Sequence, residues 1–108
     1  MNNTEISMQM ILRAGNATNC AYRAMMKAKA FSFDEAKTAM EEAEEELKAA
    51  HVEQTKLLQQ FAQGVNAQSD ILLTHAMDHL TMANVNMKMA YEMVDLYEYL
   101  NELKKGEV

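Results

Sequence analysis

Apolar residues recur every three or four positions along most of the chain, and this spacing predicts three long helices. Residues three and four apart lie on one face of an α-helix. The first helix is expected over about residues 4–30. Its apolar stripe consists of Ile6, Met10, Ala14, Ala17, Ala21, Met25 and Ala28. The pattern indicates an amphipathic helix with one face directed at a core.

A second helix is expected over about residues 33–63. Ser32 and Glu35 have the spacing of a capping box, which favours a helix start at this point. The apolar stripe is Ala36, Met40, Ala43, Leu47, Ala50, Gln54, Leu57 and Phe61. Gln54 is its one polar member, either a buried residue that fixes register or a residue at the edge of the seam. The opposite face is rich in glutamate and is interpreted as solvated.

Residues 64–69 break the periodicity and predict a loop. A third helix is expected over about residues 69–104, with Lys104 and Lys105 placed favourably for the helix dipole. Its inner stripe is Leu72, Ala76, His79, Ala83, Met87, Ala90, Val94 and Tyr97. Leu73 and Leu80 lie partly off this stripe. An apolar arc this wide exceeds what two partner helices can cover, so we expect a homo-oligomer.

The composition supports a single all-α domain over residues 1–108. There is no proline and only three glycines, so long helices can run uninterrupted. Hydrophobic residues make up 49% of the chain and aromatics only 6%, which predicts a core of Ala, Leu and Met. We expect an antiparallel, spectrin-like three-helix bundle.

The charge and the hydropathy pattern exclude several classes of function. A net charge of −6 argues against nucleic-acid binding, which depends on basic residues. No apolar run is long enough for a membrane span, and no secretory signal is visible, so we expect a cytoplasmic protein without direct membrane insertion. The single cysteine, Cys20, cannot form an internal disulfide and is interpreted as a small packing residue.

Three ionisable residues, His75, Asp78 and His79, fall within one turn of the apolar third helix. His75 and His79 are neighbours on one face, and Asp78 lies about 60° to the other side of His75. Three interpretations are open. The residues ligate a metal, although His51 is the only other histidine; one histidine accepts a phosphoryl group; or the segment only packs. No glycine-rich phosphate loop is present, so a phosphoryl group would come from another protein.

The sequence resembles a known family of the bacterial phosphoenolpyruvate-dependent sugar phosphotransferase system. This family comprises the IIA components of the lactose/cellobiose (chitobiose) class. The resemblance extends over nearly the whole chain and is carried by four segments and a signature. The signature is Leu72-Leu73-Thr74-His75-Ala76-Met77-Asp78-His79-Leu80, and the four other segments are residues 5–7, 14–17, 43–47 with 50–55, and 94–97.

The resemblance implies a histidine phosphotransferase that assembles as a homotrimer, a nine-helix bundle. His75 would accept phosphate from HPr through Nε2 and pass it to a cysteine of the IIB component, for uptake of a β-linked disaccharide. Asp78 would face the trimer axis, where three copies can bind a divalent cation such as Mg²⁺, which prefers oxygen ligands. His79 would support His75, and His51 is expected at the surface or the seam.

The chain departs from the family signature at Met77, where the family has glutamine, and at Thr74, where it has valine. Asn16 stands where aspartate is frequent. These departures leave an alternative, a non-catalytic helical adaptor or regulator that keeps the fold without phosphotransfer.

Overall fold

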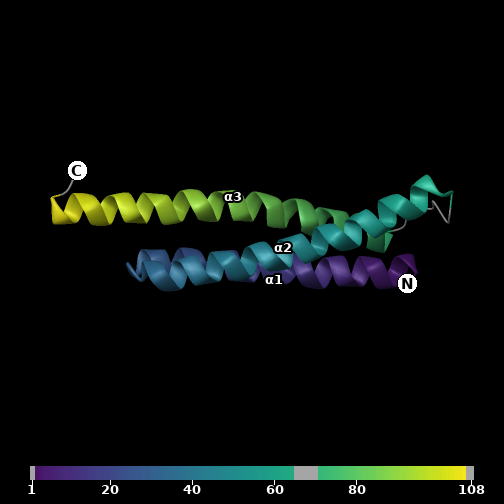
Figure 1. Ribbon diagram of the computed structural model, residues 1–108, viewed down its shortest axis with the longest axis horizontal. Helices are drawn as coiled ribbons and strands as arrows, with labels where there is room; N and C mark the ends of the chain where they lie inside the picture. The colour runs from purple at the N-terminus through teal and green to yellow at the C-terminus, as the bar shows by residue number, and fades with distance from the viewer. Residues whose placement is uncertain (1, 65–70, 107–108) are drawn as a thin grey trace.

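The computed structural model describes residues 2–64 and 71–106, which form three helices in an up-down-up arrangement (Figure 1). These are α1 (Asn3–Lys29), α2 (Phe33–Ala62) and α3 (Ile71–Lys105). The predicted all-α three-helix bundle is confirmed, and the predicted ends agree to within about one residue wherever they can be compared. The expected start of the third helix at residue 69, and the loop that follows Gly64, lie outside the described residues.

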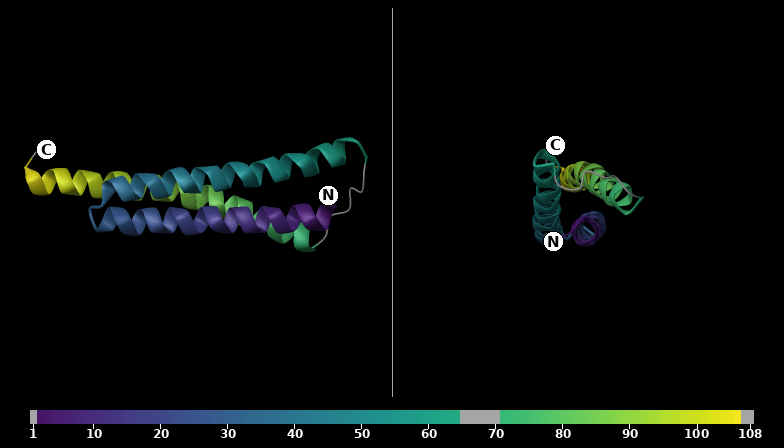
Figure 2. Two further views of the ribbon diagram at one scale, coloured as in Figure 1. Left: turned by 60° about the horizontal axis from the view of Figure 1, so that its bottom comes forward. Right: turned by 90° about the vertical axis from the view of Figure 1, so that its right-hand side faces the viewer.

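The three helices make an elongated bundle of 60 × 20 × 18 Å. Helix α1 packs along both of the others, whereas α2 and α3 contact each other much less (Figure 2). The C-terminal part of α3 extends past the turn between α1 and α2 (Figures 1 and 2). None of the helices in the described part of the chain combines the length and apolar character that a membrane crossing requires.

The core is built from small residues, as predicted. Alanines from all three helices are fully buried, and a few larger side chains fill the space between them, among them Ile6, Met10 and Leu57. Leu73 and Leu80 were expected to lie partly off the inner stripe, but both are buried among Ile6, Met10 and Leu57. The inner face of α3 is therefore rotated toward them, and His79 lies half-buried at its edge.

The starts of α1 and α2 are made differently. Asn2 caps α1, because its Oδ1 accepts a hydrogen bond of 2.8 Å from the backbone N–H of Glu5. Ser32 is the N-cap of α2, as predicted, but its side chain makes no capping hydrogen bond, so the expected capping box is not formed. Its ψ of 71° differs from the extended backbone of an ordinary N-cap and follows Phe31, whose φ is 60°.

The α1–α2 turn contacts the last turn of α3 through the ring of Phe31. The rings of Phe31 and Phe33 lie 5.9 Å apart, and Lys104 Nζ lies 5.3 Å from the centre of the Phe31 ring. Cation–π contacts of this kind hold a flexible lysine against a ring. The end of α3 is thereby kept beside the turn, and the remainder of α3 lies alongside α1.

Candidate functional site: a histidine pair in the groove between α1 and α3

His75 and His79 face each other on successive turns of α3. Their Nε2 atoms lie 3.1 Å apart, and their rings meet edge to face with centroids 4.5 Å apart. The predicted placement on one helix face is confirmed. At this distance one Nε2 donates a hydrogen bond and the other accepts it through its lone pair. The accepting imidazole therefore has an unprotonated Nε2 with a lone pair, the form that a nucleophile requires, and this lone pair is directed at the partner histidine.

The two histidines line a groove of about 510 Å³ between α1 and α3. The groove is lined by Gly15, Thr18, Asn19, His75, Asp78, His79, Met82 and Asn86. Asn86 Nδ2 donates a hydrogen bond of 3.5 Å to Thr18 Oγ1 and so joins the two walls. The sequence analysis did not identify Thr18, Asn19 or Asn86 as site residues. The spacing of His75, His79, Met82 and Asn86, at four, three and four residues, was the signal for the α3 wall.

His51 belongs to a different cluster, between α2 and α3. Its Nδ1 lies 3.3 Å from Gln54 Oε1, and its Nε2 lies 3.3 Å from Asn84 Oδ1. Gln54 Nε2 in turn donates to Met77 Sδ at 3.6 Å. The expectation that His51 lies at the surface or seam is confirmed, and Gln54 is a half-buried, hydrogen-bonded residue at the edge of the seam.

Within the described residues, no group of three or more His, Cys, Asp and Glu side chains could hold a metal ion in one chain. His75, Asp78 and His79 do not form a complete ligand set by themselves. The interpretation that these three residues hold a catalytic metal within one subunit is therefore unsupported.

The arginines of α1 are directed away from the groove. Arg13 Nη1 contacts Glu46 at 3.2 Å on α2, and Asn16 Nδ2 donates to the same carboxylate at 3.3 Å. Arg23 pairs with Glu42 of α2, whose hydrogen bond and negative charge raise the pKa of the guanidinium. The fold thus brings neither arginine to His75.

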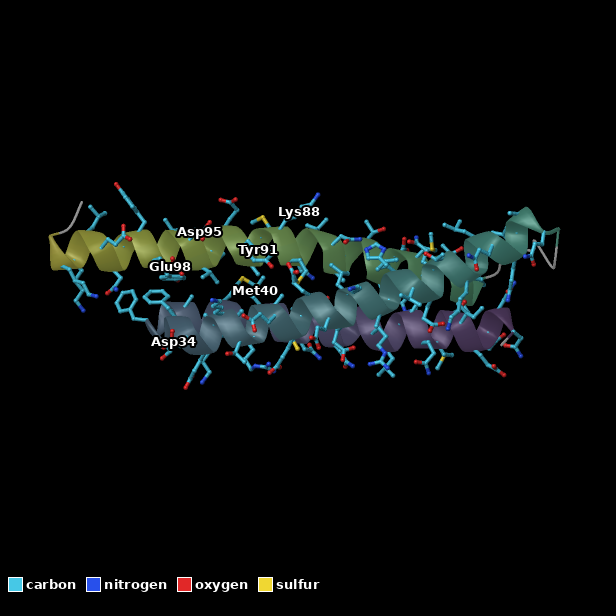
Figure 3. All side chains as sticks on the ribbon, viewed as in Figure 1. Asp34, Met40, Lys88, Tyr91, Asp95 and Glu98 are labelled. Atoms are coloured by element: carbon cyan, nitrogen blue, oxygen red, sulfur yellow. The ribbon has the colours of Figure 1, made fainter. Side chains whose placement is uncertain are left out.

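A second polar link between α2 and α3 lies further along the bundle. Tyr91 projects from α3 toward α2 and donates a hydrogen bond to Glu44, whereas Lys88 points away from the bundle (Figure 3). Partial burial, followed by the hydrogen bond and charge of Glu44, raises the pKa of Tyr91 to about 12. This link lies outside the histidine groove.

Asp78 lies at the edge of the groove, where it meets an exposed apolar stripe on α3. Side chains in this stripe are about half exposed or more, although they are large and hydrophobic: Ile71, Met82, Val85, Met89, Leu96, Leu100 and Leu103. From Met82 onward these residues follow one another at intervals of three, four or seven, and Ile71 precedes Met82 by eleven residues on the same face. Contiguous exposed apolar surface of this kind marks a protein interaction site.

Comparisons with known proteins identify the family of this chain. Residues 5–98 match the family described as the lactose/cellobiose-specific IIA subunit of the phosphotransferase system. The chain belongs to this family. It is 36% identical over 104 residues to the lichenan-specific phosphotransferase enzyme IIA component of Bacillus subtilis, covering 96% of this chain and 94% of the relative.

Two further relatives support the assignment to the IIA family. The cellobiose-specific EIIA component of Lactococcus lactis is 37% identical over 99 residues, covering 92% of this chain and 85% of that protein. The crystal structure of the cellobiose-specific enzyme IIA from Bacillus anthracis superimposes with a TM-score of 0.88 at 39% identity, covering 94% of each chain. The chain is therefore a IIA component of the lactose/cellobiose type in both sequence and fold.

Proposed function

We propose that this IIA protein is a phosphocarrier in which His75 accepts a phosphoryl group from phospho-HPr and passes it to a cysteine of a IIB component. The transfer would serve the uptake and phosphorylation of a β-linked disaccharide. The observation that carries the proposal is the 3.1 Å contact between His75 Nε2 and His79 Nε2 at the edge of an open groove.

His79 prepares His75 for attack in this proposal. When His79 donates its Nε2–H, the lone pair of His75 is fixed at Nε2 and its proton is on Nδ1. The hydrogen bond from His79 breaks as the phosphoryl group approaches, which frees the lone pair of His75 Nε2 to attack phosphorus. The bond from phosphorus to the HPr histidine breaks with its electrons returning to that ring. The His79 N–H is then close enough to donate to a phosphoryl oxygen. Phosphoryl transfer of this kind depends mainly on positioning and electrostatic stabilisation.

In the onward step, His75 becomes the phosphoryl donor and the IIB cysteine becomes the acceptor. A thiolate of the IIB cysteine attacks the phosphorus, the bond from phosphorus to His75 Nε2 breaks, and the electron pair returns to the ring. No nucleotide takes part, which agrees with the absence of a glycine-rich phosphate loop from the sequence.

We further propose a homotrimer built on the exposed apolar stripe of α3. Helix α2 carries exposed glutamates, among them Glu41, Glu42 and Glu45, and is therefore more polar than this stripe. Closed three-fold symmetry would bury the apolar stripe of each copy and bring the three Asp78 carboxylates together. Light scattering that gives the mass of one chain would contradict this assembly.

Asp78 fits the role of an axial metal ligand in that trimer. Its side chain is exposed on the same stripe, and a carboxylate is the hard oxygen donor that Mg²⁺ prefers. Within the described residues, one chain gathers no group of three or more ligands, so the proposed site would need three copies of Asp78. The ion would relieve the repulsion among three like charges and hold the subunits together.

The departures from the family signature fall outside the groove of a single subunit. Met77 is not a lining residue of the groove, and its sulfur accepts a hydrogen bond from Gln54 on α2. Thr74 does not line the groove either. The intact His75–His79 pair therefore favours phosphotransfer over the alternative of a non-catalytic adaptor with the same fold.

The test is intact-protein mass spectrometry after incubation with phosphoenolpyruvate, enzyme I and HPr. We expect the mass of one phosphoryl group on the wild-type protein and none on His75→Ala. His51→Ala is the matched control, because His51 is exposed and lies in the α2–α3 cluster. An unmodified wild-type protein would support the adaptor, and phosphate on His75→Ala would assign the reaction to another residue.

A further inference from the structure

The α1 wall of the His75 groove offers hydrogen bonds but no positive charge. Its lining residues are Gly15, Thr18 and Asn19, and no lysine or arginine lines the groove in the described part of the chain. The charged residue among the lining side chains, apart from the two histidines, is Asp78. A phosphoryl group on His75 carries about two negative charges and would meet only neutral donors on this wall.

The fold directs the cations of α1 toward α2 instead. Three ion pairs connect these two helices: Arg13–Glu46, Arg23–Glu42 and Lys27–Glu35. The three basic residues lie on the side of α1 that faces α2, whereas Thr18 lies on the groove side. Asn19 lies between the two sides, because it lines the groove and also the hollow between α1 and α2 that contains Arg23. The neutrality of the groove is therefore a consequence of how α1 is oriented, although the helix carries several basic residues.

Thr18 and Asn19 have donors available for a ligand. Thr18 Oγ1 accepts a hydrogen bond from Asn86 Nδ2, which leaves the hydroxyl proton free to be donated. Asn19 is exposed, and its side-chain amide has no hydrogen-bond partner among the described residues. A Cβ built on Gly15 would meet no atom within 4 Å, so the space beside these donors is open.

We propose that Thr18 and Asn19 form the receiving side of the phosphoryl site and that Asn86 positions the Thr18 hydroxyl. The proposal rests on the proposed function of His75. A neutral donor lacks the additional Coulomb attraction that an arginine or lysine side chain has for an anionic phosphoryl group. The phosphoryl group would thus be oriented by Thr18 and Asn19 without being held as tightly as in a basic pocket, which suits a carrier that must release it.

The test uses phosphoramidate, a small donor that phosphorylates histidine without a partner protein. The lone pair of His75 Nε2 attacks phosphorus, the P–N bond of phosphoramidate breaks, and ammonia leaves. We expect the side-chain amide signals of Asn19 to shift in the NMR spectrum upon phosphorylation. We also expect the melting temperature to rise upon phosphorylation, because the phosphoryl group adds contacts between α1 and α3.

The variants are Thr18→Val, which keeps the side-chain shape and removes the hydroxyl, and Asn19→Leu. We expect each to remove much of the phosphorylation-dependent rise in melting temperature, and Thr18→Ser to restore it. Thr38→Val is the matched control, because Thr38 lies on α2 and its hydroxyl bonds to the Asp34 carbonyl. Asn19→Lys should enlarge the rise and slow transfer to a IIB component about tenfold, since it adds a charge-assisted bond.

The outcomes separate this inference from the proposed function. If phosphoramidate modifies His75 but HPr does not, the carrier function fails while the role of Thr18 and Asn19 is still measured. The inference is overturned if the Asn19 amide signals do not move on phosphorylation, or if Thr18→Val and Asn19→Leu show the same melting-temperature rise as Thr38→Val. A wild-type His75 that phosphoramidate leaves unmodified also overturns it, because the groove would then not admit a phosphoryl group.

Discussion

His75 and His79 share a hydrogen bond between their Nε2 atoms, 3.1 Å apart, across one turn of α3. Since only one of the two nitrogens can hold the proton, each histidine determines the tautomer of the other. This reciprocity makes His79 a positioning residue in the proposed transfer, and it gives the first test of the site.

His79→Ala should slow phosphorylation of His75 by HPr by about tenfold, because a hydrogen bond that fixes the tautomer contributes about 1–2 kcal/mol. His79→Gln should recover part of the rate, since its amide N–H can donate to His75. Rapid-quench measurement of phosphoprotein against time gives both rates. Equal rates for wild type and His79→Ala, with unchanged circular dichroism, would leave His79 with only a structural role.

Asp78→Leu should remove bound divalent cation while the trimer persists. In the proposed trimer, the substitution would replace three converging carboxylates with apolar side chains that match the exposed stripe of α3, and repulsion at the axis would be relieved at the same time. Metal content by mass spectrometry and molecular mass by light scattering are measured on the same sample. Asp95→Leu is the control, an exposed aspartate further along α3. An unchanged metal content in Asp78→Leu would place the cation elsewhere.

The number, order and approximate ends of the helices followed from the sequence, because an apolar residue every three or four positions leaves only one face to bury. The rotation of α3 did not follow. The stripe chosen from spacing included His79 and left out Leu73 and Leu80, but both leucines are buried and His79 lies at the edge. A helix with a wide apolar arc has several possible inner faces, and only packing against Ile6 and Leu57 selects one.

The α3 side of the site could be predicted from the sequence, whereas the α1 side could not. His75, Asp78 and His79 could be identified because three ionisable residues in one turn of an apolar helix require an explanation. Thr18 and Asn19 could not, because short polar residues are unremarkable on a helix surface. They become part of a site only when α1 is placed beside α3, which no local pattern specifies.

Tyr91 should ionise at a pH of about 12 rather than near 10, since partial burial and Glu44 raise its pKa. A raised folded-state pKa means that the stabilisation is fully present below the unfolded value of about 10 and is lost as the pH rises toward about 12. The stability difference between wild type and Tyr91→Phe should therefore disappear over this window. Ultraviolet titration of tyrosinate measures the ionisation, and Glu44→Gln should lower the pKa. Coincident titration of all four tyrosines would contradict the Glu44 contact.

Leu57 and Leu58 offer a matched pair for testing the core, because they are adjacent on α2 and differ in burial. Leu57 is 2% exposed and packs with Ile6, Met10 and Leu73, whereas Leu58 is 56% exposed. Leu57→Ala should lower the free energy of unfolding by about 2–5 kcal/mol, the sum of lost transfer energy and a cavity. Leu58→Ala should change it by about 0.5 kcal/mol or less. Urea unfolding at one protein concentration measures both, so that self-association contributes equally. Similar losses for the two variants would mean that the exposed face of α2 is buried in the assembled protein, which the proposed packing through α3 does not allow.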